Sequence, residues 1–271
     1  MTELQHVIAT LIAEGDSVDR LVADIDDAQW SLPTPAPGWA VRHQVAHLSF
    51  IFRLATAAAA APEMFKAIAA KSEGNFDRAV NAALAEYEND TSQELLARWR
   101  ADRAKGEQAL NAVPATSLVP WLVRPIPAGV LAAAGMMELV AHGQDIADAL
   151  GRTREWTDRI KYVVGFAVQV WDFGYLARGL KTPDVQFGFE LTAPSGAIWR
   201  FGPEDAAQRI TGSAVDFCLL ATRRRHRADV DLVAVGADAD HWLDIAQAYR
   251  GGVGAGRSPG QFRGEAQGLV A

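Results

Sequence analysis

Glu138 and His142 stand four residues apart in a segment whose spacing predicts a helix, so their side chains project from one stripe of it. Asp145 lies one turn further along the same stripe. The opposite side carries Met136 and Val140, which predicts that the helix is buried. A carboxylate and an imidazole inside a buried helix need partners, and a divalent metal ion would satisfy both. The spacing alone is also common in surface contacts and in hydrogen-bonded core pairs.

A second inward-facing histidine is predicted on another helix, which runs from about Ala40 to Pro62. On that helix His47 shares a stripe with apolar residues, whereas Arg53 lies roughly opposite. Taken by itself, His47 is best interpreted as a core histidine that is hydrogen-bonded to a neighbour. His43, one turn earlier, is a candidate second donor near the start of the helix.

Together, His47, Glu138 and His142 offer two nitrogens and one oxygen as ligands. Metal ligands in a helix bundle come from facing helices, and this donor set is that of catalytic zinc, which keeps one coordination position open. Asp145 is placed to hydrogen-bond a ligand or a water molecule, and such a contact orients a metal-bound imidazole. The combination predicts a metal site more specifically than any of its members.

Four long helices are predicted to carry these ligands. Proline-rich loops at 32–39 and 119–127 separate them, and Trp39 and Trp121 in these loops are expected to line the mouth of the site. A further helical piece is expected around 76–84. The four helices are expected from about 4 to 26, 40 to 62, 91 to 113 (opened by a capping box of Thr91 and Glu94) and 128 to 150. The first 150 residues therefore predict a helix bundle.

The period of the apolar residues changes in the second part of the chain. Residues 185–192 alternate, 194–196 carry a turn signal and 197–201 return, which predicts a β-hairpin. The other elements expected here are a helix at 158–177, a strand at 207–211, a helix at 213–222, a strand at 230–235 and a helix at 239–249. The predicted fold class is α+β: a helix bundle at 1–152, a smaller α/β domain at 153–262 and a tail at 263–271.

The chain has 271 residues and a formal net charge of −7, without a clustered basic face apart from four arginines between 223 and 227. This charge argues against general affinity for nucleic acid, which depends on cations that neutralise phosphates. No stretch of about 18 consecutive apolar residues predicts a membrane span, and the start of the chain lacks a signal-peptide pattern. We therefore expect a cytoplasmic protein that binds a small-molecule substrate and neither nucleic acid nor a membrane.

The single cysteine, Cys218, excludes an internal disulfide and a CxxC site. It stands in an apolar segment, where a small buried side chain is a better interpretation than a nucleophile. Thiol chemistry would therefore use a thiol from another molecule.

Three segments resemble one family of proteins. Pro37-Gly-Trp-Ala-Val-Arg-His-Gln-Val-Ala-His-Leu48 resembles the PGW(S/T)VRDQVAHL signature of DinB-like proteins of the mycothiol-dependent maleylpyruvate isomerase group. Residues 138–145 resemble the E-x-x-x-H-x-x-D helix of that group, and residues 210–224 are similar to its C-terminal G-(S/T)-A-x-D-LLL-x-x-x-x-R pattern. The resemblance spans nearly the whole chain and is closest to a metal-binding branch of the group.

The resemblance implies a four-helix bundle that carries a divalent metal, with zinc as the expected ion and nickel as the alternative, and a C-terminal α/β domain like sterol carrier protein. Carried over residue by residue, the family's ligands fall on His47, Glu138 and His142, the set that the helix stripes also give. Two residues depart from the family pattern. Ala40 replaces a Ser or Thr helix cap, a loss of about 1 kcal/mol, and His43 replaces an Asp and could reorient a ligand or add a donor.

The resemblance further implies an enzyme that uses mycothiol or a similar low-molecular-weight thiol for isomerisation or thiol transfer on a small electrophile, with a homodimer as the assembly to consider. Arg223 or Arg224, which matches the C-terminal arginine of the family, is a candidate clamp for a carboxylate of the substrate or cofactor. A solvated charge run at a helix end explains these arginines equally well.

Two alternatives stay open at the level of sequence. One is a metal-dependent hydrolase, in which metal-bound water attacks the substrate and Asp145 acts as base. The other is a binding protein whose C-terminal domain holds an apolar ligand and whose metal is structural, although a purely structural site normally has four protein ligands.

Overall fold

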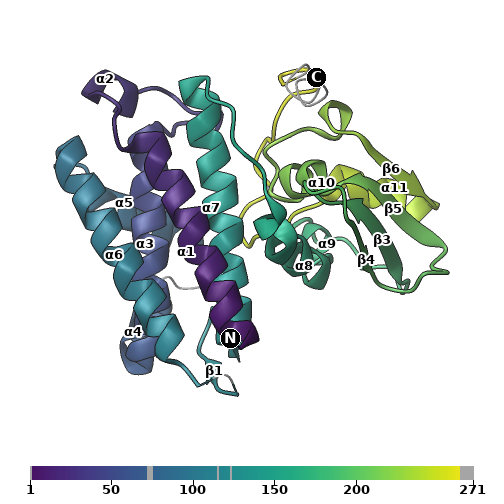
Figure 1. Ribbon diagram of the computed structural model, residues 1–271, viewed down its shortest axis with the longest axis horizontal. Helices are drawn as coiled ribbons and strands as arrows, with labels where there is room; N and C mark the ends of the chain where they lie inside the picture. The colour runs from purple at the N-terminus through teal and green to yellow at the C-terminus, as the bar shows by residue number, and fades with distance from the viewer. Residues whose placement is uncertain (1, 72–75, 115, 123, 263–271) are drawn as a thin grey trace. The chain divides into compact units, whose positions relative to one another are not determined.

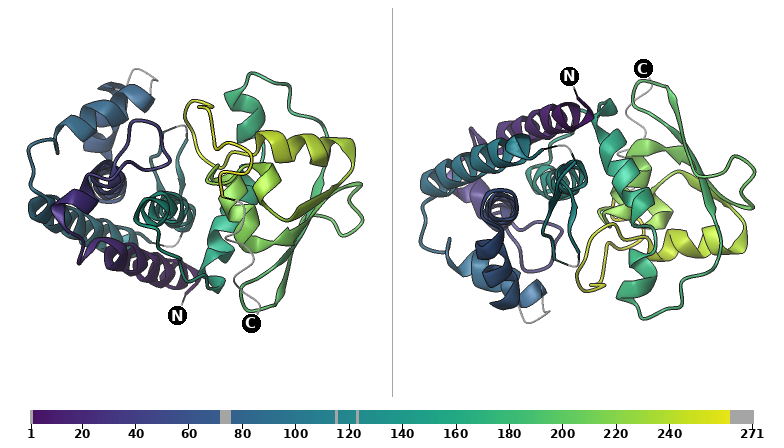
Figure 2. Two further views of the ribbon diagram at one scale, coloured as in Figure 1. Left: turned by 90° about the horizontal axis from the view of Figure 1, so that it is seen from above. Right: turned by 90° about the horizontal axis from the view of Figure 1, so that it is seen from below.

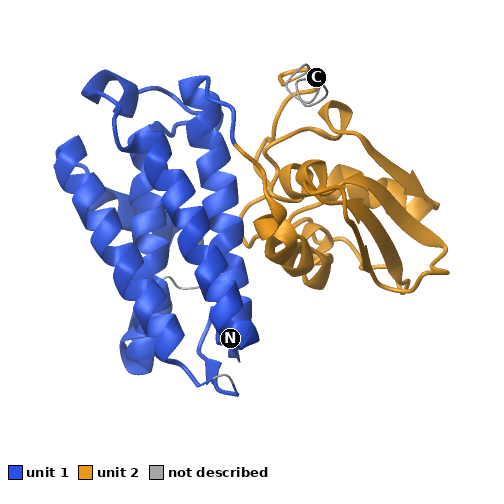
Figure 3. Ribbon diagram, viewed as in Figure 1, with its two compact units in different colours: residues 1–154 blue, residues 155–271 orange. Residues whose placement is uncertain are grey.

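The computed structural model describes residues 2–71, 76–114, 116–122 and 124–262. The chain divides into two compact units, residues 1–154 and residues 155–271 (Figure 3), and each is described by itself. The predicted tail at 263–271 lies outside the described residues. The architecture is α+β, a helical unit followed by a unit with a small sheet, which confirms the predicted fold class.

Four long helices form the frame of the first unit (Figure 1). They are α1 (Glu3–Val22), α3 (Val41–Ala60), α6 (Ser92–Ala112) and α7 (Ala128–Leu150). Helix α3 packs against α6 and α7, and α1 packs against the same two helices, so the four enclose one core (Figure 2). The shorter elements of this unit are α2 (Asp27–Trp30), α4 (Pro62–Lys71), α5 (Phe76–Ala85), β1 (Leu118–Val119) and β2 (Ile126–Pro127).

The helix ends follow local signals in the sequence. The capping box predicted at Thr91 is present, because its hydroxyl accepts from the Glu94 N–H while the Glu94 carboxylate accepts from the Thr91 N–H. Helix α7 ends at Gly151, whose left-handed φ of 61° closes a helix without the cost that a Cβ would add. Helix α1 ends at Val22, earlier than predicted, because Asp26 caps the separate helix α2.

Helix α7 is buried on nearly every side, as its sequence predicts. Met136 and Val140 are buried on one side of it, and Leu131 and Asp145 are buried on the opposite side. Apolar positions all round a helix are expected only where neighbours cover it. The polar groups that α7 carries are therefore held inside the protein, and each has to be satisfied there.

The second unit contains a four-stranded sheet of order β4-β3-β5-β6. Strands β3 (Phe187–Thr192) and β4 (Ile198–Phe201) form the predicted hairpin, and β3 also pairs in parallel with β5 (Gln208–Ser213). Strand β6 (Leu232–Val235) pairs antiparallel with β5. The helical elements are η1 (Asp158–Ile160), α8 (Lys161–Gln169), α9 (Phe173–Ala177), α10 (Ala214–Ala221), η2 (Arg227–Asp229) and α11 (Ala237–Ile245).

The core of the second unit is aromatic, with Phe189, Phe217 and Trp242 in mutual ring contact. Cys218, which follows Phe217 on α10, is fully buried, which confirms the prediction of a small buried side chain. Among the described residues, no helix is both long enough and apolar enough to span a membrane.

Two helix predictions for this unit were wrong in length. The helix expected at 158–177 is broken near Val170, and α9 then packs so closely that a Cβ at Gly174 would lie 2.1 Å from the Ile245 carbonyl oxygen. Helix α11 ends at Ile245 rather than near residue 249. The reason is a bond to a distant element, because the Ala248 N–H donates to the Ala221 carbonyl at the end of α10 (2.8 Å).

Candidate metal centre

The three side chains singled out from the sequence meet inside the first unit. Glu138 and His142 extend from adjacent turns of α7, and His47 extends from the facing helix α3. The Glu138 Oε2 atom lies 3.3 Å from His47 Nε2 and 3.1 Å from His142 Nε2. Each residue offers a ligand atom within 4.8 Å of the other two. Among the described residues, this is the one group of three or more such side chains that could share a metal ion.

The distances fit a shared ion. Zinc binds imidazole nitrogen and carboxylate oxygen at about 2.0–2.2 Å, which places tetrahedral ligand atoms roughly 3.3–3.5 Å from one another. The two nitrogen-to-oxygen distances at Glu138 are close to that value. The imidazole rings of His47 and His142 lie with their centroids 4.4 Å apart, so both nitrogens face the same small volume.

A chain of hydrogen bonds begins at His142 Nδ1, the ring nitrogen that does not face Glu138. The Nδ1 atom of His142 lies 2.5 Å from Gln44 Oε1, and the amide nitrogen of Gln44 donates to Thr34 Oγ1 (2.8 Å). The hydroxyl of Thr34 in turn donates to the carbonyl oxygen of Trp39 (2.8 Å). Gln44 lies on α3, whereas Thr34 and Trp39 belong to the proline-rich loop before it.

This chain determines which nitrogen of His142 carries the proton. The Thr34 hydroxyl gives its only proton to Trp39, so it must accept from the Gln44 amide, and the Gln44 oxygen must face His142. The Nδ1 of His142 therefore carries hydrogen and donates to Gln44. In a neutral ring, Nε2 is then a lone pair that points at the Glu138 carboxylate, also an acceptor. Either a second proton on the ring or a metal ion between these two acceptors removes the conflict, so the residues present are compatible with a metal ion.

On the side of the ring away from Glu138, His47 is held by packing and not by a hydrogen bond. Its Nδ1 is buried and has no hydrogen-bond partner among the described residues, while its Nε2 faces Glu138. The indole of Trp39 covers both imidazoles, with centroids 5.4 Å from His47 and 5.9 Å from His142. The loop that carries Trp39 is closed by a β-bridge between Pro33 and Ala40. Trp39 thus lies beside the site, as its place in the sequence suggests.

The charge of Glu138 is set by these neighbours. Burial by itself raises the pKa of the Glu138 carboxyl, but when His142 and His47 are protonated, their hydrogen bonds and positive charge outweigh burial and hold that pKa well below its usual range. The carboxylate is therefore ionised at neutral pH and available as an anionic ligand. The Glu138 side chain is also 19% exposed, against 6% for His47, so it is the more accessible of the two.

The other predicted site residues have different surroundings. Asp145 is completely buried one turn beyond His142, and Gln44 makes the contact with His142 Nδ1 that orients the ring. His43 accepts the Ala40 N–H on its Nδ1 (2.9 Å), which is the half of a capping box that the third helical residue supplies, whereas Ala40 itself gives no side-chain cap. Trp121 stacks on Phe65 of α4.

Arg223 and Arg224 belong to the second unit, after the end of α10. Arg223 has a left-handed φ of 61°, a position that favours glycine, and its guanidinium lies 3.4 Å from the side-chain oxygen of Gln247. Arg224 is buried and donates to the Thr222 carbonyl (2.7 Å). The interpretation as a solvated charge run does not hold for Arg224. Their role as a carboxylate clamp stays a prediction.

Sequence reasoning did not assign roles to Gln44 and Thr34. Gln44 stands one turn before His47 on the inward stripe of α3, and a fully buried amide there is a signal that it satisfies another buried group. Thr34 carried no such signal, because it lies in a loop whose path the sequence pattern does not determine.

Comparisons with known proteins agree with this architecture. The family model "Mycothiol maleylpyruvate isomerase N-terminal domain" matches residues 11–147, and a model described as "Wyosine base formation" matches residues 185–235. Two Mycobacterium tuberculosis proteins, MT0041 of strain CDC 1551 and Rv0036c of strain H37Rv, are each 41% identical over 250 residues, covering 92% of this chain and 97% of their own.

Among solved structures, the fold is similar to that of a mycothiol-dependent maleylpyruvate isomerase. The TM-score is 0.56 at 15% sequence identity, with 82% of this chain and 90% of that chain covered. A mutant of a mycothiol-dependent maleylpyruvate isomerase gives a TM-score of 0.55 over the same shares. Because the family model covers half of the sequence and contains all three clustered residues, the chain belongs to the family of the mycothiol maleylpyruvate isomerase N-terminal domain.

Proposed function

We propose that this chain is an enzyme that holds a divalent metal, with zinc as the expected ion, on His47, Glu138 and His142 and uses mycothiol or a similar small thiol. The observation that carries the proposal is the meeting of two imidazole nitrogens and one carboxylate oxygen on facing helices. Membership of a family whose name includes mycothiol and maleylpyruvate isomerase supports the choice of thiol and of isomerisation.

The chemistry follows from an open ligand set. Three protein ligands leave a coordination position for a sulfur atom, and a bound divalent ion would keep that sulfur as a thiolate, which can add to an activated double bond, permit rotation and leave again. The chain's own Cys218 is buried in the second unit, so the thiol is supplied by another molecule.

The protein residues position and screen the site. Gln44 keeps the proton of His142 on Nδ1, so that Nε2 faces inward as a donor atom. Trp39 covers both imidazoles and limits the access of water to them. Arg223 or Arg224 is our candidate for pairing with a substrate carboxylate, an assignment that rests on the sequence resemblance.

Metal content tests the ligand assignment. Wild type, His47→Ala and His142→Ala are purified without an affinity tag and analysed by mass spectrometry, with the exposed His241→Ala of the second unit as the matched control. We expect about one equivalent in wild type and in the control, and little in the other two. Equal metal in all four proteins, or none in folded wild type reconstituted with zinc, would contradict the assignment.

Turnover then tests the reaction class. The metal-loaded protein is incubated with maleylpyruvate in the presence and absence of mycothiol, and with an ester in the absence of thiol. Isomerisation that requires both metal and thiol supports the proposal. Ester cleavage without thiol would replace it with the hydrolase alternative, and neither activity would leave a binding protein.

A further inference from the structure

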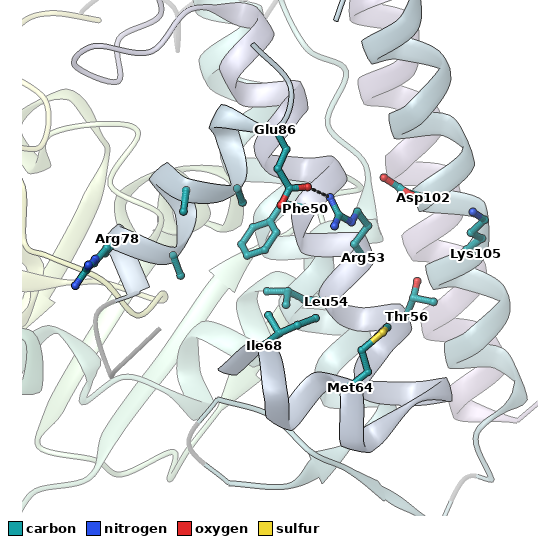
Figure 4. A pocket seen from close by; sticks show the side chains of 13 residues that line it. Phe50, Arg53, Leu54, Thr56, Met64, Ile68, Arg78, Glu86, Asp102 and Lys105 are labelled. Atoms are coloured by element: carbon teal, nitrogen blue, oxygen red, sulfur yellow. Dashed lines mark hydrogen bonds and ion pairs between the residues drawn. The ribbon is translucent and has the colours of Figure 1, made fainter. Parts of the chain in front are cut away.

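The first unit contains a cavity that is separate from the candidate metal centre, because none of the three clustered residues lines it. It lies among α3, α4, α5 and α6 and has a volume of about 570 Å³ (Figure 4). This volume is within the range of about 300–1,000 Å³ that is typical of small-molecule sites. Its apolar lining includes Phe50 and Leu54 of α3, and Met64 and Ile68 of α4. Such a lining suits the hydrocarbon part of a ligand.

Charged side chains join this apolar lining, and cations outnumber acids among them. Arg53, Arg78 and Lys105 contribute three positive charges, whereas Glu86 and Asp102 contribute two negative ones. The excess is notable in a chain whose net charge is −7. The cavity therefore favours an anion over a cation.

The guanidinium of Arg53 is held in an orientation that leaves donors available for such an anion. Its Nη1 donates to the Glu86 carboxylate (2.8 Å) and to the Tyr87 hydroxyl (3.1 Å), and Figure 4 shows the first of these contacts. Both bonds use one nitrogen, so the Nε and Nη2 donors have no partner among the described residues while the guanidinium is held in place. A fixed guanidinium with two unused donors matches the two oxygens of a carboxylate.

The acids of the lining are already engaged, and one cation is not. Asp102 accepts from the Ser49 hydroxyl (2.6 Å), and Glu86 is paired with Arg53. Lys105, one turn after Asp102 on α6, is exposed and makes no hydrogen bond or ion pair with the described residues. Lys105 can therefore add a second positive contact without breaking an existing one.

We propose that this cavity binds a small amphipathic carboxylate, with its hydrocarbon part against Leu54, Met64 and Ile68 and its carboxylate on Arg53 and Lys105. The site is separate from the metal centre and independent of the proposed reaction. It would give the protein a second small-molecule ligand.

Decanoate is the probe, used below its micelle concentration. A carboxylate could also bind a metal at the first site, so the protein is treated with EDTA before the titrations. Four methionines are present, and a ¹³C-methyl label on all of them gives a local readout. Met64 lines the cavity, whereas Met136 and Met137 are buried in α7. We expect decanoate to shift the Met64 signal, assigned with Met64→Leu, and to leave those of Met136 and Met137 unchanged.

Calorimetry of three variants tests the charged contacts. Arg53→Gln is expected to weaken decanoate binding about tenfold or more, and Lys105→Gln by roughly threefold. The matched control is Arg100→Gln, because Arg100 is also half-exposed and paired with a carboxylate, Asp19, outside the cavity. Lys105→Gln keeps the test decisive if Arg53→Gln unfolds, since Lys105 makes no contact that folding needs.

Several results would overturn the proposal. They are the absence of decanoate binding, equal affinity in wild type and Lys105→Gln, equal weakening in the Arg100→Gln control, or shifts confined to Met136 and Met137.

Discussion

Helix α7 contributes to two clusters of buried charge that are built on opposite principles. The first is the candidate metal centre of His47, Glu138 and His142. The second is an ion pair between Glu14 of α1 and Arg154, which follows the end of α7 and returns to it. Both clusters lie in the same helical unit, and both place ionised groups where water has little access.

The ion pair is closed. Arg154 donates one nitrogen to the Glu14 carboxylate and another to the Val140 carbonyl oxygen (2.8 Å), so one positive charge meets one negative charge. The helix makes room for it at Gly143, where a Cβ would lie 3.1 Å from the Arg154 guanidinium and 2.9 Å from Val18. Because the two charges balance, the pair needs no further ion.

The candidate metal centre is open. Two imidazole nitrogens face one carboxylate oxygen, and in its neutral form His142 presents a lone pair to that oxygen. The comparison teaches that buried charge alone does not mark a functional site. The mark is a cluster whose ligand atoms converge on one point that an added ion can occupy. We therefore expect substitutions in the Glu14–Arg154 pair to lower folding stability. Substitutions in the cluster of His47, Glu138 and His142 should instead lower metal affinity.

The largest effect is expected at the closed pair. Arg154→Met leaves the Glu14 carboxylate buried without its cation, which should lower the free energy of unfolding by about 3–5 kcal/mol. Urea denaturation of the metal-free protein measures it. Glu14→Gln combined with Arg154→Met should recover part of this loss. A loss below about 1 kcal/mol for the single variant would show that the pair is not closed in the way described.

The second prediction concerns metal binding more than folding stability. His47→Ala should lower the unfolding free energy of metal-free protein less than Arg154→Met does, because it removes packing but leaves Glu138 with its His142 contact. Added zinc at about 100 times its Kd should stabilise wild type by about 2.7 kcal/mol and should not stabilise the variant. Thermal unfolding with and without zinc compares them, and His241→Ala should behave as wild type. Equal stabilisation of all three would remove His47 from the ligand set.

The third prediction concerns Gln44, whose side-chain oxygen accepts the proton of His142 Nδ1. Gln44→Leu removes the acceptor of the His142 Nδ1 proton, so the ring loses its fixed orientation, and zinc affinity should fall by about 10–100-fold. Gln44→Glu keeps an acceptor oxygen in that position and should retain most of the affinity. Competition with a chelator measures both. Unchanged affinity in Gln44→Leu would show that His142 is oriented by packing alone.

The sequence predicts the clustering of His47, Glu138 and His142 because all three lie on regular helices. A period of 3.6 residues determines which side chains of α3 and α7 share a face, so the spacing alone predicts that His47, Glu138 and His142 point inward. The hydrogen-bonded chain that supports His142 could not be predicted in the same way. Thr34 and Trp39 lie in a proline-rich loop, and their contacts depend on the tertiary path of that loop.

The second unit shows the same limit in its sheet. Alternation of apolar residues predicts strands β3, β4 and β5, since it is a local property. The parallel pairing of β3 with β5 and the early end of α11 at Ile245 both arise from contacts between distant segments. Neither leaves a pattern in the residues concerned.

The smallest effect concerns the cap of α3, near the open cluster. His43 accepts the Ala40 N–H on Nδ1, which only an unprotonated nitrogen can do. Burial, reinforced by Arg42 and opposed by Glu88, lowers the pKa of His43 below its ordinary value of 6.5. The unfolded chain therefore binds this proton more readily than the folded protein, and folding stability is lost as the pH falls below about 6.5.

His43→Gln should separate the cap from its titration. Glutamine at the third helical position can accept the same N–H in a capping box, so stability at pH 7 should change by less than about 1 kcal/mol. Between pH 7 and pH 5 the variant should lose less stability than wild type, because it has no imidazole to protonate. Urea denaturation at both pH values, on metal-free protein, measures the difference. Identical losses in the two proteins would show that the cap of α3 does not depend on the neutral imidazole, and that the pH dependence of this unit arises at other groups.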